Sequence, residues 1–237
     1  MLPKEIKIRF WKNSFYWSLG FLTLWSIYYY FWQGFYNFGS FINALAGISA
    51  VMIAISFAFG TFTFYTDFLD TKLAYRKYFG LVGYWYAMLH VSLLAALHPQ
   101  ENFVNPVLKG IITQDQQLGA IAMLILTFMT VISHEKVPVL ISPKLWRNSL
   151  RLGYLIYIVF IPRAILLDGP LWSAWFEGVS ESLLLPPSLI ASILGILVIV
   201  FRLSAPPIKF FKKSLIRVKT TPPVKVTSSA EVHTKGL

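Results

Sequence analysis

The sequence predicts an all-α integral membrane protein with six transmembrane helices and with both termini in the cytoplasm. Three observations lead to this prediction: an apolar composition, six long apolar segments, and basic residues confined to alternate loops. Of the 237 residues, 56% are hydrophobic and only 13% are charged, whereas an average soluble domain has about 25% charged residues. A soluble globule of this composition would lack the polar surface to cover itself, so a soluble enzyme and a disordered protein are both excluded.

Composition also excludes several kinds of site and partner. The chain has no cysteine, which excludes disulfides, thiolate metal sites and cysteine nucleophiles. The formal net charge is +11, but the basic residues lie between apolar segments and not on one polar face, so no nucleic-acid partner is expected. No cleavable signal peptide is expected, because the first apolar stretch is too long and more spans follow it.

Six segments are apolar enough to cross a hydrocarbon core about 30 Å thick, which takes about 20 helical residues. Before the first span we expect a basic cytoplasmic N-terminus at residues 1–14, and after the last span a basic, partly disordered tail at 204–237 whose proline pairs stop the helix. Together the spans form one membrane domain at 15–203, with individual spans at residues 15–38, 41–65, 79–98, 118–133, 150–167 and 184–203.

The distribution of lysine and arginine predicts the orientation. Nineteen of the 21 basic residues fall in the N-terminal segment, the loops after the second and fourth spans, or the region from Arg202 onward, while Lys109 is alone in the opposite loops. Cytoplasmic loops accumulate lysine and arginine, so both termini are expected in the cytoplasm. We expect a multi-pass protein of a bacterial inner membrane, or of an organellar or thylakoid-type membrane. Its expected partners are lipid and either other membrane subunits or a soluble cytoplasmic protein.

Ionisable side chains at membrane depth are costly, so each is a candidate functional residue. His90 lies about 16 Å into the third span, where its imidazole either hydrogen-bonds a neighbouring helix or is an axial ligand of haem or another tetrapyrrole. His98, at the outer interface, is a weaker alternative ligand. Arg163 follows Pro162 in the fifth span and either snorkels to the outer headgroups or pairs with an anion, such as a haem propionate or another subunit's carboxylate.

No catalytic residue is expected. The sequence has no nucleotide-binding glycine loop, no helical two-histidine zinc motif and no carboxylate pair at mid-bilayer. Asp67 and Asp70 close the second span, where pairing with Lys72 or Arg76 is enough to explain them.

Two stretches resemble a known family. The sequence YRKYFGL at residues 75–81, followed by YAMLH at 86–90, resembles the RR-x-LGL … YA-x-LH signature of the ferric-reductase-like transmembrane domain. The sequence WRNSLRLGY at 146–154 is similar to that family's W-x-x-LH-R-L-x-Y stretch at the start of the fifth span. The closest branch is the haem-binding membrane subunit of the bacterial methionine-sulfoxide reductase system, and the resemblance covers roughly residues 40–203.

The resemblance implies b-type haem between the spans, with histidine ligands on the third and fifth spans and electrons passing across the bilayer. The third-span ligand is present as His90, but the two fifth-span positions fall on Leu150 and Arg163. Leucine cannot ligate iron, and arginine stays protonated with no lone pair to offer. The sequence therefore favours a non-catalytic accessory, scaffold or assembly subunit of a membrane complex. The alternative is a haem-binding electron-transfer subunit that uses His90 and a separate electron donor, and that is not a self-contained enzyme.

Overall fold

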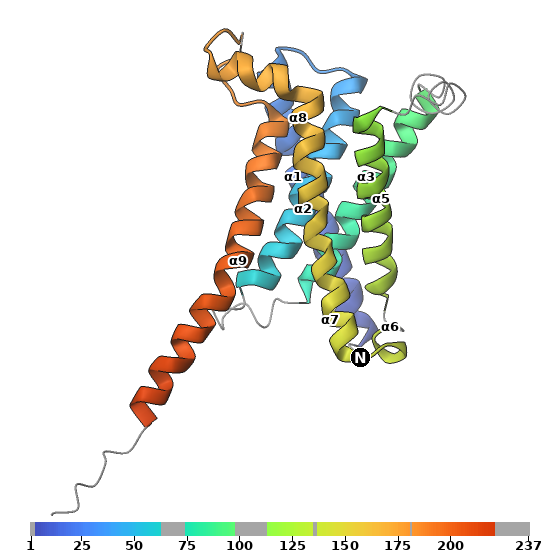
Figure 1. Ribbon diagram of the computed structural model, residues 1–237. Helices are drawn as coiled ribbons and strands as arrows, with labels where there is room; N and C mark the ends of the chain where they lie inside the picture. The colour runs from blue at the N-terminus through green and yellow to red at the C-terminus, as the bar shows by residue number, and fades with distance from the viewer. Residues whose placement is uncertain (1–2, 63–73, 98–112, 135–136, 181, 221–237) are drawn as a thin grey trace, which may run out of the picture.

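The computed structural model describes residues 3–62, 74–97, 113–134, 137–180 and 182–220, and every regular element within them is a helix. The long helices run roughly along one common axis (Figure 1). In chain order the elements are α1 (Lys4–Gln33), α2 (Phe38–Phe62), α3 (Tyr75–Leu97), α5 (Gln114–Ile132), α6 (Val137–Leu140), α7 (Pro143–Arg151), the 3-10 turn η3 (Leu152–Tyr154), α8 (Leu155–Phe176) and α9 (Pro187–Thr220).

The all-helical membrane fold is confirmed, with five described helices long and apolar enough to cross a membrane. These candidate spans are Phe38–Phe62, Tyr75–Leu97, Gln114–Ile132, Asn148–Phe176 and Pro187–Ser204. With 30 residues, α1 is also long enough. Its lysines, serines and many tyrosines make it less apolar than the others, and the predicted first span remains a prediction.

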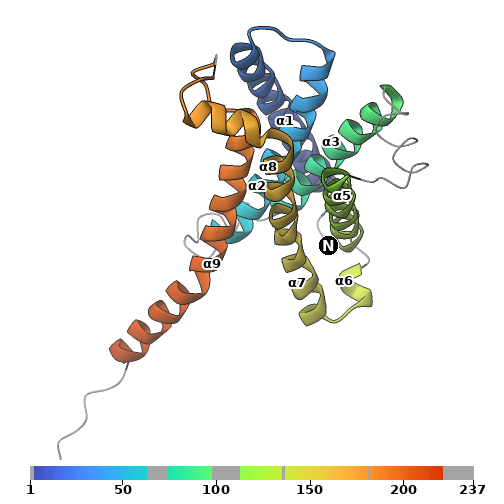
Figure 2. The same ribbon diagram turned by 45° about the horizontal axis from the view of Figure 1, so that its top comes forward.

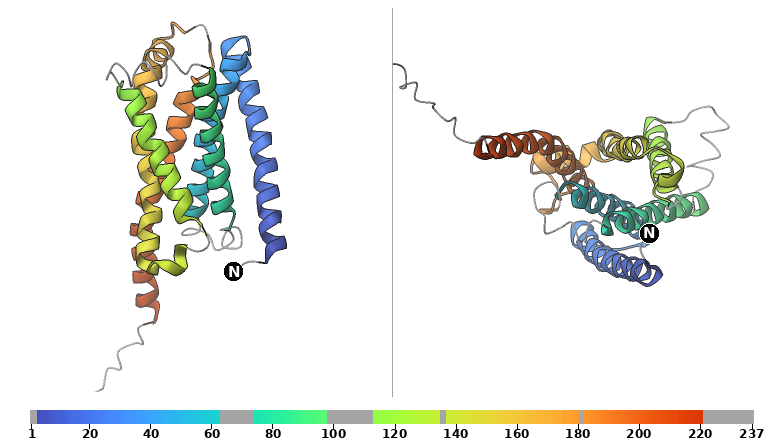
Figure 3. Two further views of the ribbon diagram at one scale, coloured as in Figure 1. Left: turned by 90° about the vertical axis from the view of Figure 1, so that its right-hand side faces the viewer. Right: turned by 90° about the horizontal axis from the view of Figure 1, so that it is seen from below.

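The five candidate spans form a closed ring in which each helix packs on two neighbours. The order around the ring is α2, α3, α5, α8 and α9, with α9 packed again on α2. Outside the ring, α1 packs against α2 and α3, as the view along the axis in Figure 3 shows. The start of α1 and the end of α9 lie at the same end of the molecule (Figure 1). We call this the basic end, because it carries Arg76, Arg151 and Arg202.

Close packing of α2 on α3 depends on small residues and on serine hydroxyls. A Cβ atom at Gly83 would lie 2.8 Å from Ile53 Cγ1 and 3.2 Å from the Ser49 carbonyl oxygen, so only glycine allows this approach. Ser49 Oγ donates to the Gly83 carbonyl at 2.8 Å, and Ser56 Oγ donates to the Arg76 carbonyl at 2.6 Å. Small residues and interhelical hydrogen bonds of this kind are what hold helices together in lipid, where the hydrophobic effect between helices is absent.

We expect Ser49→Ala to lower the free energy of unfolding by about 0.6 kcal/mol, the average measured for hydrogen bonds between membrane helices, and by about 1.7 kcal/mol at most. Reversible unfolding in mixed micelles would measure the loss. Thr127→Val is the control, because the exposed Thr127 hydroxyl donates to the Met123 carbonyl of its own helix at 2.8 Å. An equal loss in both variants would contradict a specific role for the bond between α2 and α3.

The predicted end of the first span is wrong, because the helix ends at Gln33 and not at residue 38. The helix begins at Lys4, and the predicted start of the span at residue 15 stays a prediction. The end is set by Gly34, which adopts φ +76° and donates its N–H to the Tyr30 carbonyl at 2.8 Å. Glycine reaches this left-handed conformation without the steric cost that a side chain brings, which makes it a common residue just after a helix.

The prediction that the proline pair after Arg202 stops the last helix is also wrong, because α9 continues through Pro206 and Pro207 to Thr220. These prolines lack the N–H groups that would bond to the Arg202 and Leu203 carbonyls, yet the φ angle of proline is compatible with a helix. Figure 2 shows the C-terminal part of α9 projecting beyond the rest of the molecule. The tail segment 221–237 lies outside the described residues.

Candidate functional site

The centre of the helix ring is filled by the side chain of Tyr157 on α8, which is only 1% exposed. Its hydroxyl donates to the carbonyl of Ala50, halfway along α2, at 2.9 Å. Its ring packs directly on Gly195 of α9, where a Cβ atom would collide with it. One aromatic side chain thus connects α2, α8 and α9 across the ring.

Sequence reasoning did not single out Tyr157. It lies in an apolar stretch among many other aromatic residues, and its importance depends on Gly195 and Ala50, which are distant in the sequence. No spacing or motif in one sequence connects these three positions.

His90 is held by a hydrogen bond to α2. Its Nδ1 atom lies 2.8 Å from the carbonyl oxygen of Ile42. A carbonyl can only accept, so Nδ1 carries the proton, and in the neutral imidazole the lone pair is then on Nε2. His90 lies about 22 Å from the Tyr75 end of α3 and about 10 Å from its Leu97 end. It therefore lies about 6 Å beyond the middle of α3, in the half of the helix away from the basic end.

Arg163 on α8 is directed toward α5. Its Nε donates to the carbonyl oxygen of Asp115 in the first turn of α5, at 3.1 Å. The guanidinium packs on Gly119, where a Cβ atom would lie 3.1 Å from Nε, so the absence of a side chain there makes room for it. The charges of Asp115 and Asp168 act on Arg163. Both of these acidic residues belong to the same chain as Arg163.

His90 and Arg163 are near enough to interact electrostatically, and both lie in the half of the bundle away from the basic end. Leu150 lies elsewhere, on α7 near the start of the candidate span Asn148–Phe176. A further described histidine, the exposed His134, follows α5. The weaker candidate His98 lies outside the described residues.

These residues do not fit a haem held by histidines on both the third and fifth spans. The stretch from α7 to the end of α8 contains no histidine, and the two positions that the resemblance assigns to ligands carry Leu150 and Arg163. Arg163 is already bonded to α5. Within the described parts of the chain, no three histidine, aspartate or glutamate side chains come together as a metal site. The described residues offer one axial imidazole, that of His90.

Comparison with known families gives one match. The family model described as "Ferric reductase like transmembrane component" matches residues 43–161, about half of the chain, from the start of α2 to the middle of α8. Curated protein sequences give no match. The match and the five apolar helices together identify an integral, multi-pass membrane protein.

Proposed function

The chain belongs to the ferric-reductase-like transmembrane family, and from this premise we propose that it is a divergent member that serves as a non-catalytic accessory, scaffold or assembly subunit of a membrane complex. Membership fits a protein related to electron transfer in a membrane. In this proposal the chain keeps the helix ring of an electron-transfer protein but does not itself transfer electrons.

The observation that carries the proposal is the way in which the Arg163 side chain is bonded and packed. The resemblance places a ligand histidine at this position, but the arginine side chain offers no lone pair. Its Nε is bonded to the backbone of α5, and a glycine opposite makes room for it. An arginine built into the packing in this way supports a structural role at the former ligand position.

The packing of the ring centre supports the same conclusion. Tyr157 fills the space between α2, α8 and α9 and is bonded to Ala50. In a scaffold, such a side chain stabilises the helix ring directly, with no need for a cofactor to hold the helices together.

For the membrane arrangement we propose six spans, with α1 as the first and with the basic end in the cytoplasm. The common position of the start of α1 and the end of α9 (Figure 1) agrees with an even number of spans, and the basic residues agree with the positive-inside rule. On α1, exposed aromatic side chains such as Trp17 and Phe31 are available to lipid or to a second membrane subunit. A bacterial inner membrane, or an organellar or thylakoid-type membrane, is the proposed location.

One observation favours a second candidate function, a haem-binding electron-transfer subunit with His90 as the axial ligand. Histidines that ligate metals nearly always donate their other ring N–H to a carboxylate, a backbone carbonyl or water. The bond from His90 Nδ1 to the Ile42 carbonyl is of this type and leaves Nε2 available. In this candidate a bound haem would supply one-electron chemistry. His90 would orient it, and a separate protein would donate the electrons.

A reduced-minus-oxidised spectrum of the full chain in mild detergent separates the two candidates. The accessory role predicts no Soret or α band in the wild-type protein, in His90→Ala or in the control His134→Ala, which removes an exposed histidine. Stoichiometric haem that is lost in His90→Ala and kept in His134→Ala would overturn the accessory role and support the second candidate. Haem kept in both variants would overturn both the accessory role and His90 as the ligand.

A further inference from the structure

The last part of α8 turns aside from the bundle. Pro170 lies inside the helix, directly after Gly169, and it has no N–H to donate to the Leu166 carbonyl. Sharp kinks in helices are usually found at proline. Figure 1 shows the end of α8 leaving the common axis and crossing above the start of α9. We call residues 170–176 the lateral segment.

The bend occurs where the helix has become long enough to cross a membrane. The candidate span Asn148–Phe176 has 29 residues, which would make about 43 Å as a straight helix. Residues 148–169 alone make about 33 Å, whereas the hydrocarbon core is about 30 Å thick. The lateral segment is therefore not needed to cross the core, and it lies at the membrane interface.

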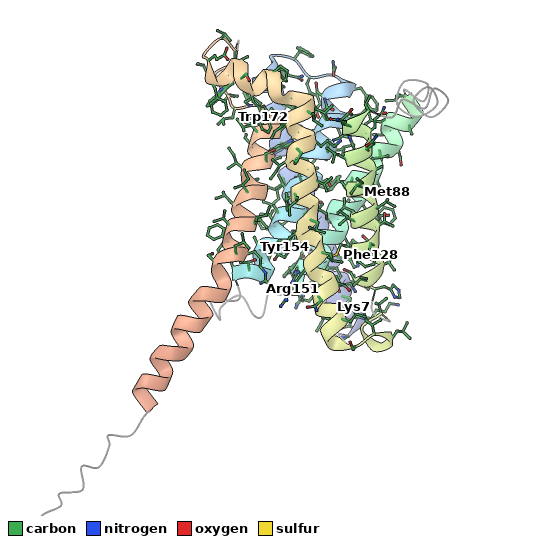
Figure 4. The ribbon with its side chains drawn as sticks, viewed as in Figure 1. Lys7, Met88, Phe128, Arg151, Tyr154 and Trp172 are labelled. Carbon is green, nitrogen blue, oxygen red and sulfur yellow. The ribbon has the colours of Figure 1, made fainter. Side chains whose placement is uncertain are left out.

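Trp172 holds the lateral segment at the level where the next span begins. Its Nε1 donates to Ser188 Oγ at 3.0 Å, and Ser188 is in the first turn of the candidate span Pro187–Ser204. Figure 4 shows Trp172 at the end of the molecule where the lateral segment meets α9. The hydrogen bond confirms the depth that the length of the span indicates.

The far end of the lateral segment is also fixed by hydrogen bonds. Gly178 adopts φ +72° and donates its N–H to the Trp175 carbonyl at 3.1 Å, while the Val179 N–H donates to the Ala174 carbonyl at 3.0 Å. This pair of bonds is the Schellman motif, which ends helices at glycine. Trp175 Nε1 donates in turn to the Leu183 carbonyl at 3.3 Å. The segment is thus a defined helix end with a fixed orientation.

The lateral segment has one apolar side and one polar side. Trp172, Trp175 and Phe176 have the i, i+3, i+4 spacing that places residues on one side of a helix. Ser173 and Glu177 fall on the other side, and both are exposed. Trp172 contacts α9. Phe176 lies one turn further from the bundle on the same side, and it is 70% exposed.

The charges near the lateral segment exclude attachment through lipid phosphates. Residues 164–201 contain no lysine or arginine, and the charged residues among them are Asp168, Glu177 and Glu181. Attraction to anionic headgroups needs basic residues near the surface. The apolar side is therefore the part of this segment that can bind lipid.

We propose that the lateral segment is an interfacial helix that inserts the Phe176 ring among the acyl chains of the leaflet at the end opposite the basic end. Amphipathic helices lie in the interface with their apolar side toward the acyl chains, and tryptophan is enriched at headgroup level, where Trp172 and Trp175 lie. The ligand is the acyl region of phospholipids, whatever their headgroup. The inference goes beyond the proposed function and depends neither on haem nor on the side that the basic end faces.

The test uses the full chain in phosphatidylcholine liposomes. Since the chain has no cysteine, one introduced cysteine can carry a nitroxide spin label without competing sites. Saturation of the electron paramagnetic resonance signal measures how often the label meets oxygen, which concentrates in hydrocarbon, and how often it meets a water-soluble nickel chelate. In Phe176→Cys we expect oxygen to be the more effective reagent. The matched control Glu177→Cys, on the other side of the helix, should give the reverse order.

A second control and a second lipid separate the outcomes. Phe128→Cys labels an exposed position within α5 and shows that the bundle is in the bilayer, and a label at 176 should resemble it. Nickel access at 176 equal to that at 177 would place the apolar side in water and overturn the proposal. Protection at 176 from both reagents would show that protein covers this side, which also overturns it.

Lipid charge provides the last arm of the test. Replacing half of the phosphatidylcholine by phosphatidylglycerol should leave the order of the two reagents at 176 unchanged, because the segment has no basic residue. Insertion that occurs only with phosphatidylglycerol would show that headgroup charge holds the segment, and the proposal would be wrong.

Discussion

Replacing Tyr157 by alanine is expected to lower the free energy of unfolding by about 3–5 kcal/mol, the cost of truncating a large buried aromatic residue. The change would remove the ring from the centre of the bundle, where the side chain is almost fully buried and packs on Gly195. It would also remove the hydrogen bond to the Ala50 carbonyl. Reversible unfolding in mixed micelles, followed by circular dichroism, would measure the loss.

Two controls separate packing from hydrogen bonding in this prediction. Tyr157→Phe keeps the ring and should cost only about 0.6 kcal/mol, the average for a hydrogen bond between membrane helices, and about 1.7 kcal/mol at most. Tyr16→Ala truncates a tyrosine of α1 that is 59% exposed, and it should change the unfolding free energy little. A loss in Tyr157→Ala no larger than in Tyr16→Ala would show that the ring centre does not depend on this side chain.

The second large effect is expected for Gly83→Leu at the contact between α2 and α3. Overpacking usually costs about 1–3 kcal/mol, and here we expect about 3 kcal/mol or more, because the crowded atoms include backbone that cannot rotate away. A new Cβ would lie 3.2 Å from the Ser49 carbonyl oxygen before the rest of the leucine is added. The same substitution would separate the Ser49 hydroxyl from the Gly83 carbonyl.

Unfolding of Gly83→Leu would be compared with that of Gly20→Leu, its matched control. A Cβ atom at Gly20 of α1 meets nothing within 4 Å, so a leucine there adds apolar surface without collision. Nearly equal stability of the two variants would contradict the close approach of α2 and α3.

Much of the fold could be predicted from the sequence, because apolar segments of membrane-spanning length are a strong signal on their own. The ends of the helices were harder to predict. The end of α1 depends on the φ angle of Gly34, and glycine is common enough in this chain that its presence did not mark a helix end. The course of α9 through Pro206 was predicted wrongly because proline usually ends helices, whereas here the lost hydrogen bonds did not stop the helix.

The candidate site was only partly predictable, for a related reason. His90 and Arg163 could be singled out because ionisable residues are rare within apolar segments. Their partners, the Ile42 and Asp115 carbonyl oxygens, could not, because every residue has a carbonyl and only the packing decides which one is near.

The continuous course of α9 has a mechanical consequence. Its 34 residues make a rod about 51 Å long, well beyond the thickness of the hydrocarbon core. Gly195 is seated against Tyr157 on this rod, while the far half projects from the bundle (Figure 2). A protein that bound the projecting half would therefore transmit force along α9 to the contact between Gly195 and Tyr157. The helix bends most easily at Pro206 and Pro207, where two backbone hydrogen bonds cannot form.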